Sequence, residues 1–518
     1  MKKKLRLAAM AAVMFCVFAS FAWAGGQGDA GTAAEEIPDI ELMLRGWVNQ
    51  PRDETDPFKA YLDETFGINI TMNNTAEFYN EILPRFATND PPDVVQFYGT
   101  QGEAYLRQLH DEGLLVEDWY NYKARMPDWL AYMDDNAEQY FTVDGKLITL
   151  CQAGPPNIWG WQIRKDWLSA LGMDVPKTPE ELLDVARAFT NDDPDNNGKK
   201  DTWGFTSSGK GQGIAEIGNF KLMWGPMDFY ISGSDVSHFV IDGTEKAFLD
   251  FMRIIVNEEL IEPNWYTVTW QQRKAVLFQG KLGTAWYPGV LVTEFVSEGA
   301  VEVEEALKLW THLPVPKASA QGGKLMSPAF FDRMNTVSAK AEQDKVKFDK
   351  IIEFLEGVAY PNDGYFAMRH GVGIDNGVRA DLPGGYTAVM FAPDAKVYRS
   401  AEGFLGSADW GRFNSTRADF VIGAKATSVD DLPGTVYQEI ELNNAGIAEP
   451  TYAPDARFIH LDKTVVGELE TLLAEFEYKY IMGETDDYAG FEKKWRQAGG
   501  DELLAEAKAQ FMQMGMMK

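Results

Sequence analysis

Between residues 40 and 97 the sequence alternates between strand-like and helix-like patterns, and this alternation limits the possible folds more than any other feature. Alternating apolar positions at 40–44 and 68–72 are typical of strands, 93–97 reads as a third strand, and 57–66 and 76–87 have helical patterns. The order strand, helix, strand, helix, strand is typical of a parallel sheet with crossover helices. The sequence therefore predicts an α/β fold.

The ends of these predicted strands are the first place to look for a binding site. In open α/β sheets, ligands bind beyond the carboxyl ends of the strands. Trp47 and Asn49 follow the first strand, and Tyr98 follows the third. We therefore expect these three residues to bind a ligand.

Helical patterns continue to the end of the chain. Thr178-Pro-Glu-Glu181 has the form of a capping box with proline at the first helical position. Apolar stripes at 465–480, 491–495 and 503–511 predict amphipathic helices that pack on a core.

Size and charge exclude several classes of protein. The 518 residues are enough for two or three domains. With 48 basic and 78 acidic residues, the net charge of −30 would repel nucleic acids and anionic membranes. We therefore expect no nucleic-acid partner.

The first 24 residues have the pattern of a cleavable signal peptide. A basic start is followed by the apolar run 7–21 and then by Ala22-Trp-Ala24, a motif that signal peptidase recognises. Phe15 precedes Cys16 where a lipid-attachment motif has a small residue, so we expect a soluble periplasmic protein. An uncleaved membrane anchor is the alternative. Only Cys151 remains after cleavage, so no internal disulfide can form.

The segment from 193 to 204 matches a calcium-binding loop. Oxygen ligands at loop positions 1, 3, 5 and 9, with glycine at position 6, suit the coordination of Ca²⁺, and position 7 would contribute its backbone carbonyl. Gly204 stands where such loops have a bidentate glutamate, so Asp192, Thr202 or water would have to complete the shell. A polar turn without a metal is the alternative. The predicted ligands are Asp193, Asp195, Asn197, Lys199 and Asp201.

Motifs for catalysis are missing from the sequence, whereas aromatic residues are frequent in its loops. Neither a nucleophile elbow, nor a zinc-protease motif, nor a phosphate-binding loop is present. Aromatic rings stack on the apolar faces of sugars, while amides and carboxylates bind the hydroxyl groups. Burial in a core is the alternative for each ring. The predicted stacking residues, besides Trp47 and Tyr98, are Trp159, Trp161, Trp286 and Tyr287.

A series of short segments spread over nearly the whole chain matches one known group of proteins. These segments are 86–95, 111–115, 143–147, 163–168 with 171–172, 178–182, 193–204, 278–283, 369–371 and 481–483. By these segments the sequence resembles the extracellular solute-binding proteins of bacterial carbohydrate ABC transporters, in particular the large group with the alginate-oligosaccharide-binding and LplA-like proteins. Two features depart from this group: the lipid-attachment motif is missing, and Thr202 replaces an acidic residue of the calcium loop.

The resemblance implies a two-lobed periplasmic-binding-protein fold. Each lobe would be a mainly parallel sheet flanked by helices, discontinuous in sequence, and a hinge would let the lobes close on a sugar. The expected N-terminal lobe comprises 36–158 and 326–396, and the C-terminal lobe 159–325 and 397–518.

The implied function is capture of an oligosaccharide and its delivery to a membrane ABC permease, by a monomer without enzymatic activity. Arg333 is a further ligand-binding candidate because a uronic acid would need a guanidinium partner. Two alternatives stay open: a secreted glycoside hydrolase or lyase, and a binding protein for peptides or another polar solute.

Overall fold

The structure is a computed structural model that describes residues 37–46, 56–133, 135–151, 159–326, 333–372, 377–391, 413, 421–452 and 455–517. The predicted signal peptide lies outside these residues, as do Trp47 and Asn49. The chain divides into two units, Met1–Ile37 and Pro38–Lys518, and every element below belongs to the second. Within the described ranges, no helix has both the length and the apolar character needed to cross a membrane.

A five-stranded sheet with the order β2-β1-β3-β13-β6 contains the predicted strands. β1, β2 and β3 are parallel, whereas β13 pairs antiparallel with β3 and β6. The predicted order of strands and helices at the start of the domain is therefore confirmed. The strands are β1 (Asp39–Arg45), β2 (Asn69–Thr75), β3 (Val94–Tyr98), β6 (Leu150–Cys151) and β13 (Arg333–Val337).

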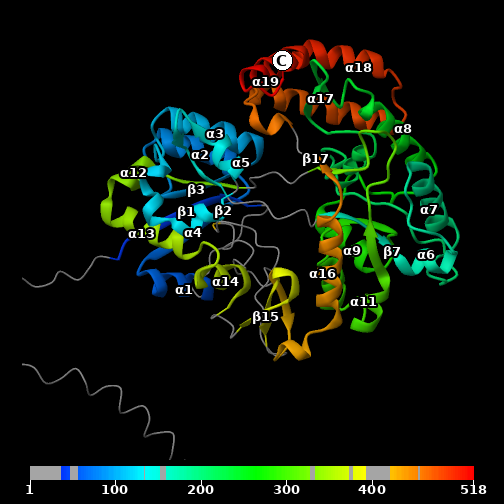
Figure 1. The fold of residues 1–518 in the computed structure, drawn as a ribbon, viewed down its shortest axis with the longest axis horizontal. Coiled ribbons are helices and arrows are strands. Elements are labelled where there is room, and N and C mark those ends of the chain that lie inside the picture. The colour runs from blue at the N-terminus through cyan, green and yellow to red at the C-terminus, as the bar shows by residue number, and fades with distance from the viewer. Residues whose placement is uncertain are drawn as a thin grey trace, which may run out of the picture. The chain divides into compact units, whose positions relative to one another are not determined.

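Helices cover both faces of this first sheet (Figure 1). The connections from β1 to β2 and from β2 to β3 run in opposite directions, so right-handed crossovers place α1 and α2 on opposite faces. α1 begins after Asp56, whose carboxylate accepts the N–H of Phe58 at 2.8 Å, and it ends at Gly67 with a φ of 63°. The helices are α1 (Pro57–Phe66), α2 (Phe78–Ala87), α3 (Gly99–Asp111), α4 (Pro127–Ala131), α5 (Asp135–Tyr140), α12 (Ala339–Gln343), α13 (Lys345–Gly357) and α14 (Asp363–His370).

A second sheet has the order β10-β7-β11 and consists of β7 (Gly160–Arg164), β10 (Thr284–Tyr287) and β11 (Trp310–Leu313). Both pairings are antiparallel, which corrects the expectation of a mainly parallel sheet in this part of the chain. Apolar patterning indicates that a strand is buried, but the connections decide its direction. Here β10 and β11 run parallel to each other on either side of β7, joined through α10 and α11.

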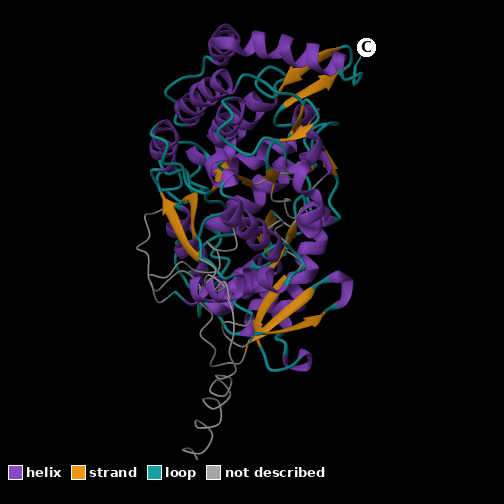
Figure 2. Cartoon of the chain, turned by 90° about the vertical axis from the view of Figure 1, so that its left-hand side faces the viewer, coloured by secondary structure: helices purple, strands orange, loops and turns teal. Residues whose placement is uncertain are grey.

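The remaining elements surround the second sheet or form small sheets of their own. Overall the structure is 50% helix and 18% strand, a mixture that Figure 2 shows and that agrees with the expected α/β class. These helices are α6 (Lys165–Leu171), α7 (Pro179–Asn191), α8 (Thr244–Asn257), α9 (Trp270–Phe278), α10 (Leu291–Ser297), α11 (Val303–Leu309), α16 (Gly434–Ile447), α17 (Lys463–Ile481), α18 (Tyr488–Trp495) and α19 (Asp501–Gln513). The two-stranded sheets are β4 (Thr142–Val143) with β5 (Lys146–Leu147), β8 (Phe229–Ser232) with β9 (Asp235–His238), and β12 (Leu325–Met326) with β17 (Thr451–Tyr452).

A third sheet, β14-β15-β16, crosses a predicted lobe boundary. β15 (Thr387–Phe391) pairs antiparallel with β14 (Val378–Asp381) and parallel with β16 (Val421–Lys425). The predicted boundary at 396/397 lies between β15 and β16. Strand pairing therefore keeps together two segments that the sequence-based division separates.

The apolar residues form two large cores. The first comes from positions 40–151 and 334–368, together with Phe413. The second comes from positions 161–315, Leu325 and 459–517, and it includes the predicted C-terminal helices. Two cores built from interleaved parts of the sequence agree with the discontinuous organisation that we expected.

A buried ionic triad fixes α17 in the second core. The Nζ of Lys221 lies 2.7 Å from Glu245 on α8 and 2.5 Å from Glu477 on α17, and all three side chains are at most 5% exposed. Burial raises the pKa of Glu245 to about 8, against the opposing effect of Lys221. The lysine is therefore the only positive charge that the triad has for its two carboxyl groups.

Replacing Lys221 by methionine should lower the free energy of unfolding by about 3–5 kcal/mol, because two buried carboxyl groups lose their counter-charge. The loss should be larger at pH 8 than at pH 5, since protonation relieves unpaired carboxylates. Lys246→Met is the control: its partner Asp250 is 50% exposed, so we expect a change of about 0–1 kcal/mol. Urea denaturation followed by circular dichroism measures both values. Equal losses in the two variants would contradict this role of the triad.

Candidate functional site

The end of the second sheet gathers four of the predicted stacking residues. β7 begins at Gly160, directly after Trp159, and β10 ends at Tyr287. Antiparallel pairing puts Tyr287 opposite Gly160 and Trp286 opposite Trp161. Since neighbouring residues of a strand point to opposite faces, Trp286 and Tyr287 lie on different faces of the sheet.

On one face, Trp159, Trp270 and Tyr287 form a ring cluster that we call the tryptophan platform. The rings of Trp270 and Tyr287 are nearly parallel, with centroids 5.3 Å apart and an interplanar angle of 16°. The centroid of the Trp159 ring lies 6.1 Å from the centroids of both the Trp270 and the Tyr287 ring. Tyr287 is buried and donates a hydrogen bond to Glu294 at 2.6 Å, while both tryptophans remain partly exposed. The platform therefore offers indole surface to a ligand.

On the other face, Trp161 and Trp286 have different environments. Trp161 is 1% exposed and stacks on Phe220, with ring centroids 3.9 Å apart. Trp286 contacts the edge of Trp161 and is partly exposed. In this structure Trp161 thus packs the second core and presents no ring face for stacking, whereas Trp286 can still meet a ligand.

The carboxyl edge of the first sheet holds two more predicted residues. Tyr98 ends β3 and Arg333 begins the antiparallel β13, so the two are register partners. Arg45 ends β1 at the same edge, and its guanidinium lies 5.3 Å from the centre of the Tyr79 ring. Tyr79 in turn donates a hydrogen bond to the carbonyl of Tyr98. The edge therefore combines two arginines with two tyrosines.

The predicted ligand-binding residues did not include Trp270, Arg273 or Arg45. The position of Trp270 could have been predicted, because Thr269 and Gln272 form a capping box that makes Trp270 the first residue of a helix, α9. Arg45 also had a signal in the sequence, at the end of the first predicted strand. Arg273 had none, since its surroundings come from segments far away in the sequence.

The predicted calcium loop folds around its own hydrogen bonds. Asp193 accepts the N–H groups of Asn197 at 3.0 Å and Gly198 at 2.9 Å. The side-chain amide of Asn197 donates to Asp195 at 2.8 Å and to Asp201 at 3.1 Å. Two carboxylates therefore converge on one amide group. Among the described residues, no group of three or more His, Cys, Asp or Glu side chains is arranged to hold a metal ion.

The electrostatics of this loop are those of closely spaced carboxylates. Burial and the neighbouring Asp193 raise the pKa of Asp195, while Asn197 and Lys281 lower that of Asp201. The hydroxyl of Thr202 is buried and donates to the carbonyl of Phe189 at 2.8 Å. Thr202 is therefore occupied elsewhere and does not complete the loop in this structure.

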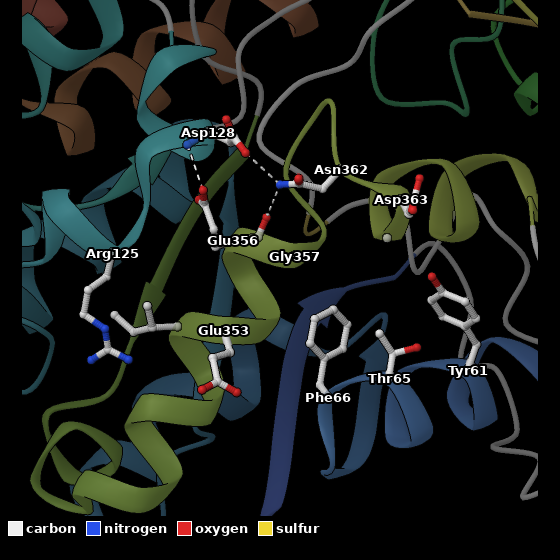
Figure 3. Close-up of a pocket in the computed structure, with 12 residues that line it drawn as sticks. Tyr61, Thr65, Phe66, Arg125, Asp128, Glu353, Glu356, Gly357, Asn362 and Asp363 are labelled. Carbon is white, nitrogen blue, oxygen red and sulfur yellow. Dashed lines mark hydrogen bonds between the residues drawn. The ribbon is translucent and has the colours of Figure 1, made fainter. Parts of the chain in front are cut away.

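A pocket of about 560 Å³ lies among α1, α4, α13 and α14, and none of the residues that line it is a predicted ligand-binding residue (Figure 3). Glu356 accepts the N–H groups of Asp128 at 2.8 Å and Trp129 at 3.1 Å. Asn362 donates to the carboxylate of Asp128 and to the carbonyl of Glu356, both at 3.0 Å. These wall groups already bind one another, so the pocket is a junction between helices rather than a ligand site with free partners.

Comparisons with known proteins show what this chain is similar to. No family model matches the chain. The polygalacturonan/rhamnogalacturonan-binding protein YtcQ of Bacillus subtilis is 25% identical over 384 residues, which cover 72% of this chain and 71% of that protein. The fructooligosaccharide ABC transporter substrate-binding protein FusA of Streptococcus pneumoniae is 27% identical over 286 residues, covering 48% of this chain and 49% of FusA.

The fold agrees with solved structures of the same kind. The alginate-binding protein AlgQ2 without calcium superposes with a TM-score of 0.64 at 17% identity, covering 92% of this chain and 98% of AlgQ2. The chain is similar to solute-binding proteins of carbohydrate ABC transporters. The expected two-lobed fold class is confirmed.

The relatives YtcQ and FusA are named as binding proteins, not as enzymes. The candidate site residues of this chain fall into two groups at sheet ends: the tryptophan platform with Trp286, and the Tyr98–Arg333 edge. Both groups combine aromatic rings with charged or polar side chains, which is the chemistry that carbohydrate recognition needs.

Proposed function

We propose that this protein captures an oligosaccharide between its two lobes and delivers it to a membrane ABC permease. Similarity to YtcQ and FusA, whose names state polysaccharide and oligosaccharide binding, supports the class of ligand. The observation that carries the proposal is the tryptophan platform at the end of the second sheet, where two indoles remain partly exposed.

In the proposed complex, sugar rings contact Trp159 and Trp270 on one face of the sheet end and Trp286 on the other. Side chains at the edge of the first sheet, Tyr98 and Arg333 among them, supply polar contacts when a hinge closes the lobes. Trp47 and Asn49, which lie outside the described residues, belong to the same proposal because they follow β1. The protein acts as a monomer.

The protein is proposed to be exported to the periplasm and to perform no chemistry on its ligand. The signal-peptide pattern of residues 1–24 supports export. Relatives that are transporter components support binding without turnover. A secreted glycoside hydrolase or lyase and a binder of peptides are the alternatives that the experiment below separates.

Calorimetric titration with a panel of neutral and acidic oligosaccharides tests the proposal. At least one oligosaccharide should bind the wild type, with no products after hours of incubation. Trp286→Ala should weaken that binding by about tenfold or more, equivalent to 1.4 kcal/mol, because it removes a stacking surface. Trp203→Ala is the matched control: this partly exposed tryptophan forms a bridge with Leu282, before β10 begins and at the far end from Tyr287.

Three results would contradict the proposal. Binding of peptides alone would assign a different solute, and release of shortened sugars would indicate an enzyme. Loss of the fold in Trp286→Ala would instead show that this ring belongs to the core.

Calcium is proposed as a structural ion of the 193–201 loop. The oxygens of Asp195 and Asp201 already converge on the amide of Asn197, and rotation of that amide would present its own oxygen in place of its N–H groups. Asp193, the carbonyl of Lys199 and water would supply further oxygens. The solved structure of a FusA EF-hand mutant supports the comparison, with a TM-score of 0.63 at 13% identity.

Adding Ca²⁺ in excess to metal-free protein should raise its melting temperature, because an ion that binds only the folded state stabilises that state. At 100 times Kd the gain would be about 2.7 kcal/mol. Asp195→Asn should abolish the shift, and Asp174→Asn, which changes an exposed carboxylate outside the loop, should not. Differential scanning calorimetry with Mg²⁺ as the comparison ion measures it. Identical melting curves with and without Ca²⁺ would exclude the site.

A further inference from the structure

Arg273 is a buried charge without an adequate partner. It lies one turn into α9, directly under Trp270, and its side chain is 1% exposed. Among the described residues, its Nε and Nη1 atoms have no hydrogen-bond acceptor. Its Nη2 atom reaches only the carbonyl of Trp286, at a long 3.5 Å. Burying a guanidinium is costly unless an anion compensates it, so this arrangement requires an explanation.

The surroundings of Arg273 do not supply that anion. Its guanidinium lies 4.1 Å from the centre of the Trp270 ring and 5.8 Å from that of Tyr287. Burial lowers the pKa of Arg273, and the negative charge of Glu216 opposes this effect. Glu216 forms no ion pair with Arg273 within the described part of the chain, because its oxygens accept hydrogen bonds from Ser207 and Ser208.

Arg164 shows how this protein holds an arginine that is purely structural. It is 5% exposed on β7, and its Nε and Nη2 atoms both bind the carboxylate of Asp166. Its Nη1 atom donates to the carbonyl of Gly280 at 3.1 Å, and its guanidinium packs 4.3 Å from the Trp167 ring. Arg164 thus has the same aromatic packing as Arg273 and, in addition, a complete set of acceptors.

We infer that a carboxylate of the ligand is the missing partner, so that Arg273 selects oligosaccharides that contain uronic acid units. This inference rests on the proposed function. Trp270, the partly exposed first residue of α9, covers the guanidinium in this structure. In the proposed complex its indole rotates away, the uronic acid ring stacks on Trp159, and the carboxylate accepts hydrogen bonds from Nε or Nη1.

The charge balance favours an acidic ligand over a neutral one. A sugar hydroxyl could accept a hydrogen bond but would leave the buried positive charge uncompensated. A single carboxylate matches a single guanidinium in charge and gives the stronger, charge-assisted bond. In a chain with 78 acidic and 48 basic residues, an unpaired arginine beside an aromatic platform is a specific attraction for an anion.

The test compares trigalacturonate with its methyl ester, which keeps the sugar framework but removes the charge. Wild-type protein should bind the acid at least about tenfold more tightly than the ester. Arg273→Met should reduce this preference by weakening the acid, with the Kd of the ester changed by less than about threefold. Arg273→Lys, which keeps the charge but loses the planar fork, should retain more of the preference than Arg273→Met. An otherwise uncharged trisaccharide that carries one sulfate group tests whether an anionic group other than a carboxylate serves as well.

Melting temperatures of the ligand-free proteins provide an independent readout. Arg273→Met should melt at or above the wild-type temperature, because it removes a charge that is unpaired until ligand binds. Arg164→Met should melt at a lower temperature, because it leaves the carboxylate of Asp166 without its partner. A marked fall for Arg273→Met would show that the arginine is structural and would overturn the inference.

Three binding results would also overturn it: equal affinity of wild type for acid and ester, equal weakening of both by Arg273→Met, or preference for the sulfated sugar. In each case oligosaccharide binding itself would stand. If no oligosaccharide of the wider panel binds, the proposed function fails together with the inference. The wild-type comparison of acid with ester decides the case even if a variant does not fold.

Discussion

Pairing between β7 and β10 is the interaction on which the candidate site depends. Its register sets Tyr287 opposite Gly160 and Trp286 opposite Trp161. A shift by one residue would exchange the faces of Trp286 and Tyr287 and separate the platform rings. Position 160 favours glycine, because the Cβ of any other residue would lie only 3.0 Å from the ring of His312, closer than a normal van der Waals contact. The sheet thus acts as a rigid support for rings that would otherwise be mobile.

Local signals were sufficient to predict much of the first sheet. The capping residue Asp56, Pro57 at the first helical position and Gly67 at the end define α1, and they are readable one after another in the sequence. The direction of strands in the second sheet was not readable, because a buried strand has the same apolar pattern in either direction. Likewise, the third sheet pairs β15 with β16 across a predicted lobe boundary, and such pairing has no local signal.

The candidate site could be predicted from the sequence only in part. Aromatic residues beside Gly and Pro pointed to carbohydrate recognition, and of the residues predicted on that ground Trp159 and Tyr287 lie together in the tryptophan platform. The same reasoning could not distinguish Trp161, which stacks on Phe220 in the second core, because burial depends on partners far away in sequence. Arg273 was missed for that reason too.

Lys221 and Arg273, two buried cations among the described residues, differ in a way that is informative. Lys221 has two carboxylates within 2.7 Å, so it holds the core together without any ligand. Arg273 has none within ion-pair distance in the described structure, and it lies beneath partly exposed indoles. One charge is therefore satisfied by folding, and the other is best explained by binding.

Small-angle X-ray scattering with and without a bound oligosaccharide tests the central claim, capture by closure of two lobes, most directly. At a sugar concentration that saturates the protein by calorimetry, the radius of gyration should fall and the scattering profile should become that of a more compact particle. An unchanged profile at proven saturation would show that the sugar binds without closure, and would contradict this account of how the protein works.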